Sequence, residues 1–188
     1  MIRRDYLIVG AGAGGISACE GIREHDKKGT IMLVGNEVAM PYQRPLLFGS
    51  LLRKSGNHAA EKICVHDSAW FQKQHIDLRL DTFITQFNIE RHLAVLSNGQ
   101  AVEFRKALLA TGSRARRPQV AGGNLWNVFY LRSLRDVQAL REIAETEHQI
   151  VIVGGGFIAL ETAAFLSQLP KAHVTLMHRA PLWSRTLW

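Results

Sequence analysis

Cysteine is scarce in this sequence, and long apolar runs are missing from it. The two cysteines, Cys19 and Cys64, are too few for a disulfide-based scaffold and too far apart for a paired thiol redox or zinc site. We therefore expect a reducing, cytoplasmic location. No apolar run reaches the roughly 18 residues that a membrane helix needs. Asp5 interrupts the basic start of the chain, which argues against a signal peptide.

Acidic residues are the minority charge. Asp and Glu number 16 against 23 Lys and Arg, which gives a net charge of +7. Such a surface attracts anions, and it suits nucleotide phosphates, an acidic protein or nucleic acid as well as a merely solvated basic surface. The sequence has no H-E-x-x-H motif, no Walker lysine and no metal-ligand spacing among its eight histidines. We therefore expect neither a metal centre nor nucleoside triphosphate chemistry.

The most informative feature that the chain does have is an internal duplication. In each copy a short apolar run meets glycines, a helical pattern follows, and a second apolar run ends the unit. The apolar runs are Tyr6–Val9 and Ile31–Val34 in the first copy, and Ile150–Val153 and Val174–Met177 in the second. This order predicts a strand, a tight turn, a helix and a parallel strand, twice in one chain.

Alternating sequences between the two copies predict a small antiparallel β-meander over residues 76–105. Asn98 and Gly99 separate two of these runs, and this dipeptide is the strongest short signal for a hairpin. A further short strand is expected at residues 106–110. The alternating runs are residues 76–80, 83–89, 93–96 and 101–104.

The region before the second copy predicts a linker and then a helix. Residues 114–118 are basic and end in proline, as is typical of a linker. Ser133 and Asp136 have the spacing of a capping box, and Val137 and Leu140 follow at helical spacing. This helix leads into the second copy.

The first glycine turn, which comprises Gly10, Gly12, Gly14 and Gly15, lies between a predicted strand and a predicted helix. In that context a G-x-G-x-x-G motif binds a dinucleotide. The first glycine permits the tight turn, the second lets the backbone approach a pyrophosphate, and the third allows close packing of the helix. The helix supplies N–H donors at its amino end.

An acidic residue is expected after the second strand, where it accepts hydrogen bonds from the ribose hydroxyls. Glu37 is the candidate, but it lies just beyond the usual position, which Asn36 occupies. We therefore treat Asn36 and Glu37 as a joint prediction, with a solvent-facing loop glutamate as the alternative.

The second glycine turn comprises Gly154 and Gly156, with Ala159 at the third position, which the pattern tolerates. Two such turns predict two dinucleotides. At the end of the second strand His178 replaces the expected acid. Because a 2′-phosphate needs cations and no carboxylate, we favour NADPH over NADH. Arg179 and Arg185 are the nearby cations, although each alone is equally compatible with a solvated loop.

Taken together, these residues resemble the two-dinucleotide flavoprotein reductases, within them the branch of ferredoxin reductases, rubredoxin reductases and apoptosis-inducing factor. The similarity runs over nearly the whole chain. It rests on both glycine turns and on residues 40–47, 109–112 and 128–132. The resemblance implies an α/β, Rossmann-like, three-layer FAD/NAD(P)-binding fold with a small antiparallel β-meander and an incomplete second dinucleotide unit.

The resemblance also implies the domains and the activity. Residues 1–115 would form the FAD-binding domain, and residues 116–188 the first half of an inserted NAD(P)-binding domain. In that family hydride passes from nicotinamide to flavin. The implied activity is that of an FAD-dependent NAD(P)H oxidoreductase, which passes electrons to a small redox protein such as ferredoxin or rubredoxin. The excess of basic residues would suit an acidic partner.

Single residues acquire implied roles as well. Glu161 matches a glutamate near the nicotinamide and flavin rings and is the one catalytic candidate, with an ordinary helix carboxylate as the alternative. Ile84 would meet the adenine through its backbone. The other implied FAD contacts are Arg44 and Pro45 beside the flavin and Ala110, Thr111 and Gly112 along the cofactor.

The sequence departs from the family pattern at three places. The family lysine that pairs with the glutamate would fall at Gly49, unless Arg53 or Lys54 replaces it. No C-x-x-x-x-C follows the first glycine turn, and no downstream G-D segment is present. We therefore keep a second hypothesis, a truncated or regulatory dinucleotide-binding module without turnover. Self-association through exposed apolar surface is a separate expectation. We expect neither nucleic acid nor a membrane as a partner.

Overall fold

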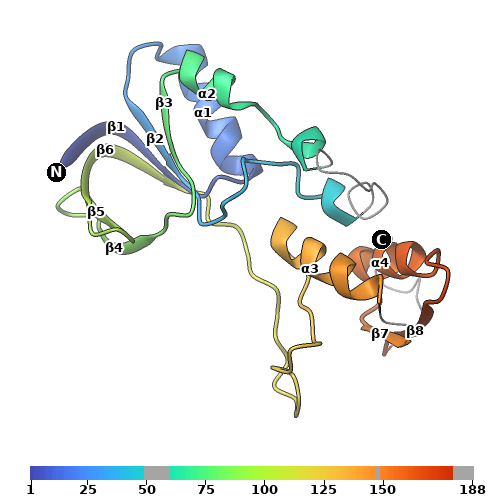
Figure 1. Cartoon of the computed structure of the whole chain (residues 1–188). Helices are drawn as coiled ribbons and strands as arrows, with labels where there is room; N and C mark the ends of the chain where they lie inside the picture. Colours follow the sequence, from blue (N-terminus) through green and yellow to red (C-terminus); the bar gives the residue numbers. More distant parts are fainter. Residues whose placement is uncertain (49–59, 147–148, 180–188) are drawn as a thin grey trace. The chain divides into compact units, whose positions relative to one another are not determined.

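The computed structural model of the chain describes residues 1–48, 60–146 and 149–179 (Figure 1). The chain divides into two compact units. Unit 1 consists of Met1–Arg44 and Cys64–Ser113, and unit 2 of Pro45–Ile63 and Arg114–Trp188.

A six-stranded sheet forms the centre of unit 1. Its strands are β1 (Ile2–Val9), β2 (Ile31–Val34), β3 (Ile76–Arg79), β4 (Ile84–Asn88), β5 (Leu93–Leu96) and β6 (Ala101–Leu109). Their order across the sheet is β3-β2-β1-β6-β5-β4. The first four in this order are parallel, and β5 and β4 extend the sheet in antiparallel fashion beyond β6.

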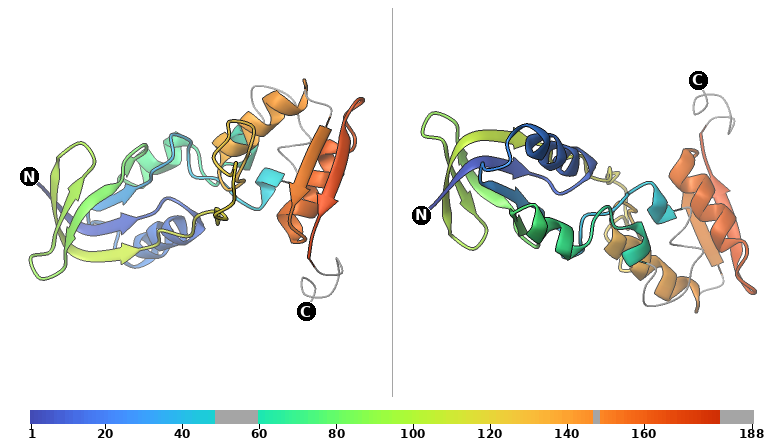
Figure 2. Two further views of the ribbon diagram at one scale, coloured as in Figure 1. Left: turned by 90° about the horizontal axis from the view of Figure 1, so that it is seen from below. Right: turned by 90° about the horizontal axis from the view of Figure 1, so that it is seen from above.

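Helices cover one face of this sheet (Figure 2). They are α1 (Ala13–His25) and α2 (Ser68–Lys73). Ile16 of α1 and Phe71 of α2 belong to the same buried apolar cluster as Ile8 of β1. Alternate residues of β1 therefore point to opposite faces of the sheet, as a strand requires.

The meander covers the other face. Leu7 and Val9 of β1 lie in a second buried cluster with Leu96 of β5 and Phe104 of β6. Because helices cover one face and the meander covers the other, all four residues of β2 are buried. The predicted three-layer α/β fold is confirmed. β2, the second strand of the first copy, has the predicted bounds.

The predicted extent of the meander is wrong at its first strand. Residues 76–79 form β3, which pairs in parallel with β2 and extends the main sheet. Their alternating sequence shows a half-buried strand, but periodicity does not distinguish parallel from antiparallel pairing. α2, which precedes β3, belongs to the crossover that parallel neighbours need.

The predicted break within residues 101–110 is also wrong. One continuous strand, β6, pairs in antiparallel fashion with β5 at its start and in parallel with β1 over most of its length. The hairpin before it is confirmed. Gly99 has a φ of +81°, and the Leu96 and Gln100 backbone groups hydrogen-bond across the turn.

Unit 2 contains the second copy of the duplication. Its strands are β7 (Gln149–Val153) and β8 (His173–Met177), and its helices are η2 (Glu61–Ile63), α3 (Leu134–Ala144) and α4 (Phe157–Leu166). β7 and β8 are parallel, as predicted, and α4 connects them. The predicted capping box at Ser133 and Asp136 begins α3.

The sheet of unit 2 is covered less completely than that of unit 1. Along β7, residues alternate between half-buried and exposed, and α4 packs against both strands. Val151 and Val153 of β7 are 61% and 78% exposed, and Met177 of β8 is 57% exposed. One face of this two-stranded sheet is therefore exposed, and on it these three apolar side chains lie among the polar Gln149, His173 and Thr175. In the described part of the chain, each helix is too short or too polar to cross a bilayer.

Candidate functional site

The first glycine turn is held between the ends of two strands. Gly10 has a φ of +114°, and its N–H donates to the Val34 carbonyl of β2 at 2.8 Å. A Cβ at Gly10 would lie 2.1 Å from the Ala110 carbonyl oxygen, which follows β6. The Ala110 N–H in turn donates to the Val9 carbonyl. The turn therefore has room for glycine alone at this position.

The start of α1 packs directly on this turn. A Cβ at Gly15 would lie 1.9 Å from the Gly10 carbonyl oxygen, which explains the third glycine of the motif. At Gly14 the nearest contact would be the Ala110 Cβ at 3.6 Å, an ordinary van der Waals distance. Gly14 is therefore less constrained by its neighbours than Gly10 and Gly15 are.

Gly12, by contrast, faces open space. It is the N-cap of α1, and a Cβ there would meet no heavy atom within 4 Å. No side chain caps the helix and its first turn contains no acid. In the same chain Asp67 caps α2, and Ser133 with Asp136 caps α3. The amino end of α1 thus offers uncapped backbone donors to an anion, and the residues present fit a pyrophosphate.

Glu37 and Arg44 form a polar cluster with Tyr42 close after β2. The Tyr42 hydroxyl donates to Glu37 Oε2 at 2.6 Å, and Arg44 Nη2 donates to Glu37 Oε1 at 2.6 Å. Arg44 Nη1 also donates to the Tyr42 hydroxyl oxygen at 2.9 Å. The Glu37 carboxylate therefore holds Arg44 in place, while the neighbouring Asn36 is exposed.

Two residues here were missed as site residues by the sequence analysis. Tyr42 is buried at 7% exposure, and it lies in the motif quoted for the family resemblance without a role of its own. A Cβ at Gly35 would lie 2.6 Å from the Ala11 Cβ, so the glycine after β2 lets the first glycine turn approach. A glycine placed directly after a buried strand is the signal that would have found it.

The segment before Ile84 is bonded to the end of β2. The Thr82 N–H donates to the Gly35 carbonyl at 2.9 Å, and the Asp81 N–H donates to the Glu37 carbonyl at 3.1 Å. Ile84 begins β4 and packs against the meander cluster. The structure therefore brings the backbone before Ile84 together with the loop that carries Asn36 and Glu37.

The remaining predicted FAD contacts lie after β6 and after Arg44. Thr111 and Gly112 are exposed, and Gly112 has a φ of +67°. Pro45 is exposed and is grouped with unit 2.

The second glycine turn repeats the first in outline. Gly154 has a φ of +146°, and its N–H donates to the Met177 carbonyl of β8 at 2.8 Å. Gly156 is the N-cap of α4, where a Cβ would meet nothing within 4 Å and no side chain caps the helix. This amino end too fits a pyrophosphate. A Cβ at Gly154 would lie 3.4 Å from the Ala159 Cβ.

His178 lies beside this turn, since its Cβ is 3.4 Å from the position of a Cβ at Gly155. His178 and Arg179 are both exposed, as is Glu161 on α4. The predicted contact Arg185 lies outside the described residues. The positions that bear on the family lysine, Gly49, Arg53 and Lys54, also lie outside them.

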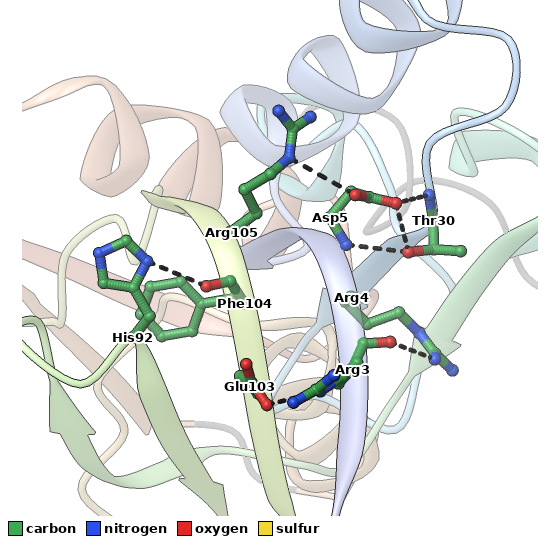
Figure 3. A pocket seen from close by; sticks show the side chains of 8 residues that line it. All are labelled: Arg3, Arg4, Asp5, Thr30, His92, Glu103, Phe104 and Arg105. Atoms are coloured by element: carbon green, nitrogen blue, oxygen red, sulfur yellow. Dashed lines mark hydrogen bonds and ion pairs between the residues drawn. The ribbon is translucent and has the colours of Figure 1, made fainter.

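A shallow pocket of about 460 Å³ lies elsewhere, at the start of β1 (Figure 3). Its arginines are paired with carboxylates, Arg3 with Glu103 at 2.8 Å and Arg105 with Asp5 at 3.5 Å. None of the predicted site residues lines it. The pocket is lined by Arg3, Arg4, Asp5, Thr30, His92, Glu103, Phe104 and Arg105. It is therefore a different place from the two glycine turns.

Neither Cys19 nor Cys64, both within the described residues, is part of a disulfide. Cys19 is buried in α1, and burial raises the pKa of its thiol to about 12. This thiol is therefore protonated at neutral pH and is not a nucleophile.

Comparison with known proteins connects this geometry to a family. Residues 4–187 match the family described as pyridine nucleotide-disulphide oxidoreductase. The chain belongs to this family. Among curated relatives, it is 37% identical over 180 residues to the ferredoxin–NAD(+) reductase component of the 3-phenylpropionate/cinnamic acid dioxygenase of Photorhabdus laumondii. It is 34% identical over 179 residues to putidaredoxin reductase of Pseudomonas putida.

These alignments cover 96% and 94% of this chain but only 45% and 42% of the two relatives, so the chain spans less than half of their length. Among solved structures, a ferredoxin reductase from Rhodopseudomonas palustris matches with a TM-score of 0.84 at 31% identity, covering 92% of this chain and 42% of that one. The covalent complex of putidaredoxin reductase with putidaredoxin matches with a TM-score of 0.82 at 32% identity, covering 94% and 42%. The resemblance inferred from the sequence is confirmed.

Proposed function

We propose that the chain is the amino-terminal part of an FAD-dependent NAD(P)H oxidoreductase that passes electrons to a small redox protein. The observation that carries the proposal is the pair of glycine turns, each of which leads into a helix whose amino end has no side-chain cap. The relatives that act on ferredoxin, rubredoxin or putidaredoxin support this choice of reaction.

FAD is proposed at the first glycine turn. The backbone at Gly12 and the first turn of α1 would bind its pyrophosphate, because no side chain occupies that space. Asn36 is the proposed ribose contact, since the Glu37 carboxylate already holds Tyr42 and Arg44. The backbone near Ile84 would face the adenine, since its loop is bonded to the Glu37 backbone.

Arg44 is the proposed charge beside the flavin, with Pro45, Ala110, Thr111 and Gly112 as further contacts. Bound FAD would supply the step between a two-electron donor and a one-electron acceptor. The protein's own contribution is orientation: Glu37 and Tyr42 fix the Arg44 guanidinium, and the N–H groups of the turn fix the phosphates. Glu161 stays a catalytic proposal on the strength of the family pattern.

NADPH is proposed at the second glycine turn in preference to NADH. His178 stands where an acid would bind an unphosphorylated ribose, and Arg179 follows it, with Arg185 a further predicted cation. Titration of the protein with NADPH and with NADH tests this preference. We expect tighter binding of NADPH, and replacement of Arg179 by serine should weaken NADPH more than NADH. Equal affinities for both would contradict the proposal.

The proposed domains are residues 1–115 for FAD and residues 116–188 for the first half of the NAD(P)-binding domain. The division of the chain after Ser113 supports this boundary, while residues 45–63 group with unit 2. The proposed partner is a small acidic redox protein, and the proposed location is the cytoplasm. Self-association through the open face of β7 and β8 is a further proposal, supported by the exposure of Val151 and Val153.

The visible spectrum of the purified protein tests the function. We expect FAD to bind with a shifted flavin absorption band, and NADPH or NADH added without oxygen to bleach that band. Binding of both nucleotides without bleaching would favour a regulatory module without turnover. A protein that takes up no FAD would contradict the proposed site.

A further inference from the structure

One side chain, His66, holds the segment before α2 against both helices of unit 1. The Glu20 carboxylate of α1 accepts a hydrogen bond from His66 Nε2 at 2.6 Å. The His66 ring also stacks on Trp70 of α2, with the ring centres 3.7 Å apart and the ring planes 6° from parallel. The position and the orientation of the imidazole are therefore both fixed, although its side chain is 23% exposed.

The backbone next to His66 supports a neighbouring segment. The Val65 N–H donates to the Pro41 carbonyl at 2.9 Å, and Cys64 forms an antiparallel bridge with Tyr42. Val65 also packs against the buried cluster that α1 and α2 share with the sheet. Two segments that are separated in the sequence therefore lie side by side, and the segment that contains His66 attaches the other to α1.

Tyr42 connects this support to Arg44. The Tyr42 side chain is buried, and Arg44 Cζ lies 5.1 Å from the centre of its ring. The Tyr42 hydroxyl accepts a hydrogen bond from Arg44 Nη1 at 2.9 Å, and the Glu37 carboxylate binds both residues. A continuous series of contacts thus runs from α1 through His66 and Tyr42 to the Arg44 guanidinium, and all of it lies in unit 1.

We propose that His66 is a positioning residue for Arg44 at the flavin. The inference rests on the proposed function, which places Arg44 beside the flavin. Reduction adds negative charge to a flavin, so a cation that is held close to it favours the reduced form. An arginine that can turn into water is screened and favours the reduced form less. His66 thus acts through Arg44 on the reduction potential of bound FAD.

The reduction potential of bound FAD, measured against a reference dye at saturating FAD, tests this role. His66→Ala should lower the potential by about 30 mV, which corresponds to a tenfold loss in the preference for reduced over oxidised flavin. His92→Ala is the matched control. The His92 ring also stacks on an aromatic ring of unit 1, that of Phe104, but it lies in the meander. This variant should keep the wild-type potential.

Glu20→Ala distinguishes positioning from a direct effect of charge. Removal of a carboxylate would by itself raise the potential, because a negative charge disfavours reduction. If Glu20 acts through His66 and Arg44, the potential should fall instead, by less than in His66→Ala. The Glu20 side chain is 40% exposed on a helix, so the variant should keep its fold. A rise in potential would overturn the proposal.

A double-mutant cycle decides whether the effect of His66 passes through Arg44. Arg44→Met removes the charge beside the flavin, and in this background His66→Ala should leave the potential unchanged. A further fall, as large as the fall in the wild-type background, would overturn the proposal. So would an unchanged potential in His66→Ala alone.

Hydrogen exchange of the chain without FAD gives a readout that does not depend on the cofactor. The Val65 amide should exchange about tenfold faster in His66→Ala and at the wild-type rate in His92→Ala. Unchanged protection of Val65 in His66→Ala would overturn the proposal. A wild-type protein that takes up no FAD would contradict the proposed function and this inference together, whereas bound FAD with an unchanged potential in His66→Ala would overturn the inference alone.

Discussion

The two glycine turns of the chain share a design but differ in how they are supported. At the first turn Gly10 is hydrogen-bonded to β2 and also pressed against Ala110, which follows β6. At the second turn Gly154 has the equivalent hydrogen bond to β8, but a Cβ placed there would meet only Ala159 of α4, the helix that follows the turn. The first turn is therefore fixed from both sides of β1, and the second from one side of β7.

This difference extends to the strands. Every residue of β2 is buried, while β7 and β8 each expose alternate residues, among them Val153 at 78%. What the two turns have in common is the open space at Gly12 and Gly156. The open space that a phosphate would use is thus present at both turns, although only the first turn is tightly packed. The space for binding therefore does not depend on how closely the surrounding strands are packed.

Alanine at the first glycine of each turn tests the difference in support. Gly10→Ala places a Cβ 2.1 Å from a backbone oxygen at a φ of +114°, and should destabilise the protein by about 4 kcal/mol. In Gly154→Ala the new Cβ would lie 3.4 Å from the Ala159 Cβ, which is not a clash. Only the backbone strain at a φ of +146° remains, and it should lower stability by about 1–2 kcal/mol.

Urea unfolding measures the two effects, and hydrogen exchange at the β1 and β7 amides assigns each loss to its unit. Equal losses at Gly10 and Gly154 would mean that contact with Ala110 does not constrain the first turn.

Valine at the second glycine of each turn tests the shared feature. Gly12→Val fills open space, so stability should change by no more than about 1 kcal/mol, the scale of helix-cap effects. FAD uptake should nevertheless be abolished, because the side chain blocks the approach of a phosphate to the backbone. Flavin absorbance after gel filtration measures the uptake.

Gly156→Val is the matched control. It should keep FAD uptake and lose binding of NADPH, measured by titration. Unchanged flavin content in Gly12→Val would contradict the assignment of FAD to the first turn.

Local signals in the sequence predicted both turns and their strands. The glycine spacing, the apolar run Ile31–Val34 and the capping box at Ser133 each act within a few residues, so the sequence is sufficient to find them. The pairing of β3 with β2 and the continuity of β6 were predicted wrongly, because a strand's partner is decided by the packing of distant segments.

The site shows the same limit. Asn36 and Glu37 could be chosen from the sequence only as a pair. The hydrogen bonds of Glu37 with Tyr42 and Arg44 are the basis for proposing Asn36 as the ribose contact, and they depend on side-chain geometry that spacing alone does not supply.

Among the described residues, the cluster of Glu37, Tyr42 and Arg44 belongs to unit 1 alone. Disrupting it should therefore affect the first glycine turn and not the second. Glu37→Gln removes the charge that holds Arg44, and FAD affinity should fall about tenfold, which matches the loss of one charged hydrogen bond. Tyr42→Phe should have a smaller effect in the same direction. Fluorescence titration with FAD measures both, and NADPH affinity should not change in either variant. A fall in NADPH affinity would indicate general misfolding instead.

The smallest expected effect is a difference in acid sensitivity between the units. Asp77 of β3 in unit 1 accepts hydrogen bonds from Arg79 at 2.6 Å and from Arg4 at 2.6 Å. Partial burial acts to raise the pKa of Asp77, but these hydrogen bonds and the arginine charges outweigh it, and the net shift is downward. In unit 2 the ion pair of Arg141 with Glu145 at the end of α3 is longer, at 4.0 Å.

A lowered folded-state pKa means that the stabilisation by Asp77 is complete above its ordinary pKa, about 3.9. It is lost as the pH falls through that value towards the lower folded-state pKa. Exposure to water keeps the contribution below about 1 kcal/mol. Asp77→Asn should therefore lower the stability of unit 1 at pH 7 and flatten its loss between about pH 5 and 3. Urea unfolding across that range, read at the β3 amides by hydrogen exchange, measures the slope. An unchanged slope in Asp77→Asn would show that another carboxylate governs the acid sensitivity of the sheet edge.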